Sequence, residues 1–224
     1  MDIAEMKTNP AALGFRVKSG WAVWILVDGS IQRPHLCNSG VIDLSDPRRP
    51  ETRQPYHAAM GKLETSASKL KRRRQSVRRA AERSIFDLLK RCGDDGYTVH
   101  RAGVVVGSVI DPNSIVNPHI RAHALEGELF RTTLKAALES RGIRCSICRE
   151  RDIYAKASKS LRRSLGQIKR ALADLGDSVD GPWRADQELA ALAAWMSLQS
   201  AHRSSDARRR RSAAPARTSK ASLY

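Results

Sequence analysis

The succession of strand-like and helical segments constrains this chain more than any other feature. Three strand-like runs come first, over residues 13–17, 21–27 and 36–44. Asp28-Gly29, directly after the second run, is a strong hairpin-turn signal. Two further strand-like runs, 99–106 and 144–149, alternate with helical patterns over residues 56–91, 117–141, 151–175 and 184–202. This order predicts an α/β fold with a mixed five-stranded sheet, a three-strand meander followed by alternating helices and strands, and helices on both faces.

The length and the composition suggest how the chain is organised. A chain of 224 residues is typical of one medium-sized domain with tails. Residues 1–11 are expected to form a flexible lead, and residues 12–202 the folded domain. Residues 203–224 are rich in Arg, Ser and Ala, a composition that indicates a disordered basic tail.

The formal net charge of +17 is concentrated in two segments. Lys62–Arg91 contains eleven Lys and Arg against three acids, and Arg203–Tyr224 contains seven against one. Such an excess favours a polyanionic partner, and nucleic acid is the expected one, with RNA or DNA left undecided. In the middle of the first helix, the candidate phosphate contacts are Lys71, Arg72, Arg73, Arg74 and Arg78. The alternative is an ordinary solvated helix face.

The apolar pattern and the N-terminus indicate the cellular location of the protein. No apolar run approaches the roughly 20 residues needed to span a bilayer. The N-terminus lacks a signal-peptide pattern, so a cytoplasmic location, no membrane partner and reduced thiols are expected. Cys145 and Cys148 form a C-x-x-C, but within a strand they face opposite sides, so no zinc site is expected there.

Short motifs in the second half resemble one family. They are Asn117-Pro118, Ala124–Gly127, Leu134–Ile143 and Arg184–Ala193. These segments are similar to those of the RuvC Holliday-junction resolvases, a branch of the ribonuclease H-like superfamily whose order of elements matches the one above. The resemblance implies three or four carboxylates that hold two Mg²⁺ ions for phosphodiester cleavage.

The acids that this resemblance implies are largely missing. The first would fall at about Arg16 and the second at about Gly107-Ser108, and neither position is acidic. Asp186 or Glu188 matches the acid of the last helix. One carboxylate does not hold two hard cations, so Mg²⁺ is disfavoured and the domain is expected to lack two-metal nuclease activity.

The helix over 117–141 carries a polar cluster at helical spacing. His119, His123, Glu126 and Phe130 fall on one arc, next to an apolar stripe that is expected to face the core. The stripe consists of Ile120, Ala124, Gly127, Leu134 and Leu138. One interpretation is that these histidines are satisfied structural groups. The other is a site at the sheet end that also holds Arg16, Lys18 and Ser108.

An anion is the ligand that such a site would suit. Arg16 and Lys18 would supply cationic donors, and Ser19 and Ser108 lie beside glycines that allow close backbone approach. The run Arg53–His57 either lines the same cleft or forms an entry turn.

In this interpretation His119 or His123 would act as acid or base, oriented by Glu126 and Asp186. Two histidines and one Glu could also ligate zinc or iron, but the basic neighbours argue against a metal, and none is expected.

Three functions remain open from the sequence. The leading hypothesis is a nucleic-acid-binding module with a basic anion-binding cleft. The alternative is an enzyme, of the nuclease or phosphotransfer class, that acts on nucleic-acid or nucleotide phosphates through the Arg, Lys, His and Glu cluster. The third is an interaction protein that forms a homodimer through its long helices. The sequence leaves open whether the protein is an enzyme.

Overall fold

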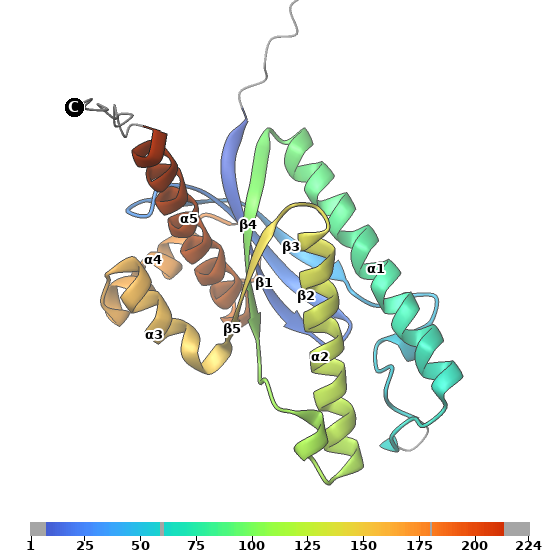
Figure 1. Ribbon diagram of the computed structural model, residues 1–224. Coiled ribbons are helices and arrows are strands. Elements are labelled where there is room, and N and C mark those ends of the chain that lie inside the picture. Colours follow the sequence, from blue (N-terminus) through green and yellow to red (C-terminus); the bar gives the residue numbers. More distant parts are fainter. Residues whose placement is uncertain (1–7, 59–60, 180, 213–224) are drawn as a thin grey trace, which may run out of the picture.

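A mixed five-stranded sheet in the order β3-β2-β1-β4-β5 forms the centre of the molecule (Figure 1). The computed structural model describes residues 8–58, 61–179 and 181–212, with side chains as far as Leu198. The strands are β1 Asn9–Lys18, β2 Trp21–Gly29, β3 Pro34–Asp43, β4 Tyr97–Val106 and β5 Arg144–Arg149. The first three are antiparallel neighbours, whereas β4 pairs in parallel with both β1 and β5. The predicted sheet of three meander strands and two alternating strands is therefore confirmed.

Helices cover both faces of this sheet. They are α1 Ala67–Asp94, α2 Pro118–Glu139, α3 Glu150–Leu161, α4 Leu165–Gly176 and α5 Ala185–Ser212. One core lies under α1 and α2, and a second core lies under α3, α4 and α5. Alternate residues of β1 serve the two cores: Phe15 and Val17 join the first, whereas Ala12 joins the second. Arg16 shares the second face, so its side chain points to the α5 side of the sheet.

The helix α5 approaches the sheet backbone through two neighbouring glycines. Gly14 of β1 and Gly103 of β4 are paired in register. A Cβ atom at Gly14 would lie 1.9 Å from the Ala190 carbonyl oxygen, and one at Gly103 would lie 2.6 Å from that of Ala193. Only glycine fits at these two positions, because the backbone of α5 occupies the space of a side chain.

Several predicted boundaries are wrong. The first strand starts at Asn9, inside the expected lead, and α1 starts at Ala67 rather than at residue 56. Ser66 caps α1: its side chain accepts from the Lys69 N–H, and Glu64 accepts from two backbone N–H groups just before it. The segment before the cap forms turns and a bridge between His57 and Leu63 instead of helix.

The second half of the chain also departs from its expected boundaries. The helical segments expected over 151–175 are the two helices α3 and α4, because Arg162 adopts a left-handed conformation with φ 55° and Ser164 starts α4 with a capping box. The last helix extends to Ser212, beyond the start of the expected tail at Arg203. Residues 213–224 lie outside the described residues.

The core stripe expected on α2 is correct only in its second half. Leu134 and Leu138 are fully buried, but Ile120 is 55% exposed and Gly127 is exposed. Glu126 and Phe130 are buried instead. In the first two turns of α2, the histidines face the segment before α1. The apolar stripe therefore faces solvent at that end of the helix. Across the described ranges, no helix has the length and apolar content to cross a membrane.

Candidate histidine–glutamate site and basic helix surface

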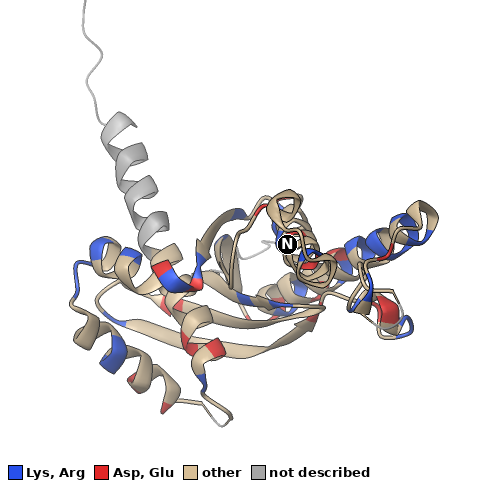
Figure 2. Cartoon of the chain, turned by 90° about the horizontal axis from the view of Figure 1, so that it is seen from below, with Lys and Arg blue, Asp and Glu red and all other residues tan. Residues whose placement is uncertain are grey.

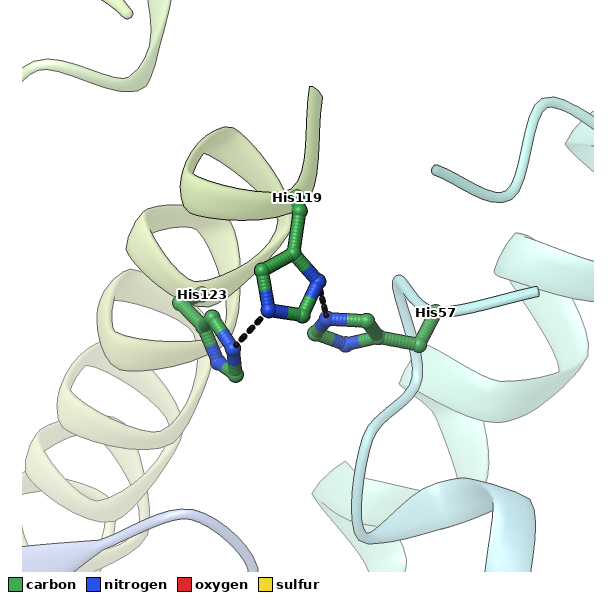
Figure 3. Close-up of side chains that lie close together, drawn as sticks. All are labelled: His57, His119 and His123. Atoms are coloured by element: carbon green, nitrogen blue, oxygen red, sulfur yellow. Dashed lines mark hydrogen bonds between the residues drawn. The ribbon is translucent and has the colours of Figure 1, made fainter. Parts of the chain in front are cut away.

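The N-terminal half of α2 brings His119 and His123 one turn apart on the same side. Asn117 caps the helix by accepting from the backbone N–H groups of His119 and Ile120 at 3.0 and 3.2 Å, and Pro118 follows in the first turn. His57, from the segment before α1, approaches the two rings from the opposite side (Figure 3). The three ring centroids lie 4.6–5.1 Å apart. We call His57, His119, His123 and Glu126 the histidine–glutamate cluster.

Glu126 is the fully buried member of this cluster. Its Oε1 lies 2.8 Å from His57 Nδ1 and accepts from the Tyr56 N–H at 3.2 Å. Its Oε2 lies 3.6 Å from His123 Nδ1 and makes no hydrogen bond with the residues that the structure describes. Because a buried carboxylate needs partners, Glu126 ties the segment before α1 to α2. The side-chain partner of Glu126 is thus His57.

Arg73 holds the segment that carries His57. Its Nη1 donates to the carbonyl oxygens of Pro55 and His57 at 3.0 and 3.1 Å and lies 3.5 Å from Glu64 Oε2. The backbone N–H of Ser66, which donates to Glu64, lowers the pKa of the Glu64 carboxyl below its usual range. Arg73 was expected to contact phosphate, but its guanidinium is instead used inside the protein.

Arg16 and Lys18 form a separate ion-pair cluster on the α5 side of the sheet. Lys18 Nζ lies 2.9 Å from Asp186 Oδ1, and Arg16 Nε lies 3.5 Å from the same oxygen. Arg16 also donates to Glu150, the first residue of α3, through Nη2. Two cations and two carboxylates therefore balance one another, and Arg16 is only 6% exposed. This pairing does not leave the free cationic donors that an anion site requires.

The residues expected in one site thus lie in two groups. His119, His123 and Glu126 are on the α1–α2 side of the sheet, whereas Asp186 pairs with Arg16 and Lys18 on the other. Ser108 lies in the exposed segment after β4, next to Gly107, where a Cβ atom would lie 4.0 Å from Arg16 Nη2. The expected convergence is therefore wrong.

Ser19 does lie close to the histidine–glutamate cluster. It lines a hollow of about 340 Å³ together with Arg53, Gln54 and His57. The run Arg53–His57 thus lines a hollow, but Arg16, Lys18 and Ser108 do not line it.

The exposed basic residues of α1 lie on two sides of the helix. Lys71, Arg74 and Arg78 line a hollow of about 570 Å³ together with Leu70 and Gln75. On the other side, Arg72 lines a smaller hollow with Arg49, Lys69 and Ser76. Figure 2 shows this clustering of Lys and Arg on the helix at the right, α1. Lys71, Arg74 and Arg78 have no ion-pair partner in the part of the chain that the structure describes.

The C-x-x-C motif follows the expected strand geometry. Cys145 packs against the core under α1 and α2, and Cys148 packs against the core under α5, so the two thiols face opposite sides of β5. Burial raises the pKa of Cys145 to about 12. Because the two thiols face opposite sides of the strand, they cannot bind one metal ion together.

Comparison with known proteins identifies the class of fold. No protein-family model and no curated protein matches this sequence. Among solved structures, the chain is similar to Thermus thermophilus RuvC in complex with a Holliday junction substrate, with a TM-score of 0.52, 9% identity, and coverage of 86% of this chain and 95% of that one. A second T. thermophilus RuvC structure gives a TM-score of 0.51 at 9% identity, with 87% and 96% covered. The chain has a ribonuclease H-like fold.

Within that class, the arrangement is the one found in RuvC. The expected RuvC-like, ribonuclease H-like fold is thus confirmed. Because identity is only 9%, the similarity concerns the fold and not the chemistry.

Proposed function

We propose that this protein is a nucleic-acid-binding domain that contacts phosphates through α1 and lacks two-metal nuclease activity. The observation that carries the proposal is the stripe of Lys71, Arg74 and Arg78. Positions three and seven residues apart fall on one side of a helix and span about 10 Å along its axis. Three exposed cations in such a row match the regular charges of a nucleic-acid backbone.

The structural neighbours support nucleic acid as the partner class. T. thermophilus RuvC was solved with a Holliday junction substrate. The fold of our chain covers most of that structure, so a nucleic acid is a reasonable ligand to test first. Duplex DNA, four-way junction DNA and duplex RNA are the three probes that separate the options.

The ion-pair cluster around Arg16 supports the absence of two-metal chemistry. The Mg²⁺ ions that the fold family implies need hard oxygen ligands. Here Asp186 and Glu150 supply such oxygens, but Arg16 and Lys18 already neutralise them. These residues do not fit a pair of Mg²⁺ ions, so we assign no step to such ions.

An enzyme acting on phosphates is the second candidate. The hollow lined by Ser19, Arg53 and His57 favours it, because it places a cation and an imidazole around a space of about 340 Å³. Turnover of nucleic-acid or nucleotide substrates that is lost in Arg53→Gln would support this function. Activity that is absent, or unchanged by that substitution, would refute it.

Binding should be measured by fluorescence anisotropy of labelled probes over a series of salt concentrations. The test variant replaces Lys71, Arg74 and Arg78 by Gln. The matched control replaces three exposed cations on α3 and α4 by Gln: Lys159, Lys169 and Arg170. Both variants lose three positive charges and both keep the C-terminal basic segment.

For duplex DNA, each lost phosphate contact should reduce the salt slope by about 0.9, which gives about 2.7 for the test variant. The control should keep nearly the full slope. Equal losses in both variants would show that only net charge matters and would refute a binding surface on α1.

A further inference from the structure

Three imidazole rings converge beside the first two turns of α2, and the nucleic-acid proposal uses none of them. His57, His119 and His123 each place a ring nitrogen within 4.8 Å of those of the other two. In Figure 3 the His119 ring lies between the other two rings, with a nitrogen directed at each. Two of the rings come from α2 and the third from the segment before α1, so the fold and not the local sequence brings them together.

Protein acceptors face the Nδ1 atom of every ring. His57 Nδ1 lies 2.8 Å from Glu126 Oε1, and His119 Nδ1 lies 3.2 Å from the Gly61 carbonyl oxygen. His123 Nδ1 lies 3.6 Å from Glu126 Oε2. Carbonyl and carboxylate oxygens only accept, so in the His57 and His119 rings the proton belongs on Nδ1 and the lone pair on Nε2. Metal-bound histidines are held in the same way by outer carboxylates and carbonyls.

The separation of the nitrogens suits a small tetrahedral ion. With Zn–N bonds of about 2.0–2.1 Å, tetrahedral geometry separates two ligand nitrogens by about 3.3 Å. His119 Nε2 and His123 Nε2 lie 3.3 Å apart. His57 Nε2 lies 3.3 Å from the other nitrogen of the His119 ring. Binding through all three Nε2 atoms therefore requires the exposed His119 ring to rotate.

We propose that His57, His119 and His123 bind one divalent transition-metal ion of the zinc class through their Nε2 atoms. Glu126 is the positioning residue that orients two of the rings. Imidazole nitrogen is a preferred ligand for such ions, and three protein ligands leave one coordination position open to solvent. This inference does not rest on the nucleic-acid proposal.

The charges around the cluster include the buried Glu126 and the Arg53 side chain, which lines the hollow beside His57. Basic neighbours were expected to repel a metal, but Arg16 and Lys18 pair with carboxylates on the opposite side of the sheet. Arg73, which does lie near His57, donates to carbonyl oxygens and lies 3.5 Å from Glu64. The buried carboxylate of Glu126 supplies a negative charge, and within the described ranges one of its oxygens has no hydrogen bond. A bound cation would balance that charge.

The test uses the full-length chain, stripped of metal with a chelator, and Zn²⁺ alone as the probe. Titration against a chromogenic chelator gives the stoichiometry and the affinity. We expect one equivalent of Zn²⁺ at this site, and an affinity about 100-fold weaker or worse in His119→Ala and His123→Ala. Both residues are exposed, so these variants should fold. Glu126→Gln should weaken binding about 10–100-fold, as loss of an outer carboxylate does at other metal sites.

Two controls make the result specific. His100→Ala removes an exposed histidine of β4 and should leave the affinity unchanged. A second group that could hold an ion, formed by Asp28, His35 and Cys37, is removed in the double variant His35→Ala/Cys37→Ala. Co²⁺ bound by the wild-type chain at the histidine site should give a tetrahedral spectrum without a thiolate charge-transfer band.

Three outcomes would overturn the proposal. The first is the absence of Zn²⁺ binding under chelator competition. The second is that His119→Ala and His123→Ala both bind Zn²⁺ with full affinity. The third is that the double variant His35→Ala/Cys37→Ala no longer binds Zn²⁺. Unchanged affinity in Glu126→Gln would overturn the positioning role of Glu126. Circular dichroism of each variant shows whether the fold is intact.

Discussion

The contact between α5 and Gly14 predicts a large effect from a single methyl group. In Gly14→Ala the new Cβ would lie 1.9 Å from the Ala190 carbonyl oxygen and 2.5 Å from the Ala194 nitrogen. Real Cβ contacts essentially never fall below 3.0 Å, so α5 and β1 must separate by roughly 1 Å. Both contacting atoms are backbone, so no side chain can rotate away.

The expected cost is at the upper end for overpacking, about 3 kcal/mol of the free energy of unfolding. With an m-value of about 2 kcal/mol/M in urea, the unfolding midpoint should fall by about 1.5 M. Tryptophan fluorescence and far-ultraviolet circular dichroism both follow this transition.

Gly127→Ala is the matched control. Gly127 lies within α2, and a Cβ there would meet nothing within 4 Å. The same substitution should stabilise the protein by roughly 0.5–1 kcal/mol, because alanine is the better helix residue. A midpoint for Gly14→Ala equal to or above that of the wild type would refute the close seating of α5 on β1.

Arg73→Gln should lower the free energy of unfolding by about 2 kcal/mol, because charged hydrogen bonds to two carbonyl groups are lost. It should also weaken Zn²⁺ binding, because Arg73 holds the segment that carries His57. Urea unfolding measures the first effect and zinc titration the second. Burial raises the pKa of Cys145 to about 12, against an ordinary 9.0. Between these two values the thiol ionises in the unfolded chain but not in the folded one, so the free energy of unfolding falls as the pH rises from 9 toward 12. Cys145→Ala should therefore show a shallower loss of thermal stability over that window than the wild type; parallel curves would contradict this. Mg²⁺ at millimolar concentration should produce no cleavage of a labelled four-way junction on a denaturing gel, and cleavage lost in Asp186→Asn would overturn the proposed absence of two-metal activity.

The fold was predictable because its signals are local. Hydrophobic runs and turn residues placed five strands in the right order, and the strand over 144–149 was predicted with its exact bounds. The start of α1 was not predictable in the same way. Its cap depends on Glu64 accepting from Thr65 and Ser66, and the preceding segment is held by Arg73 donating to carbonyl groups. Helical propensity alone does not reveal such contacts.

The candidate site was predictable only in part. The spacing of His119, His123 and Glu126 on one helix placed them together correctly. His57 lies more than sixty positions earlier in the sequence, and only the packing of α1 against α2 brings it to them. The pairing of Arg16 with Asp186 is also non-local, so the sequence suggested free cations where the structure has balanced ion pairs.

The ion-pair cluster has a consequence for the mechanical behaviour of the sheet. Arg16 and Lys18 belong to β1, Glu150 begins α3, and Asp186 lies in the first turn of α5. Charge thus cross-links three elements that are far apart in sequence, at the same strand that α5 touches through Gly14. Because these charges neutralise one another without a metal ion, the contacts among β1, α3 and α5 should persist in a chelating buffer. High salt should weaken them, because it screens the more exposed pairs.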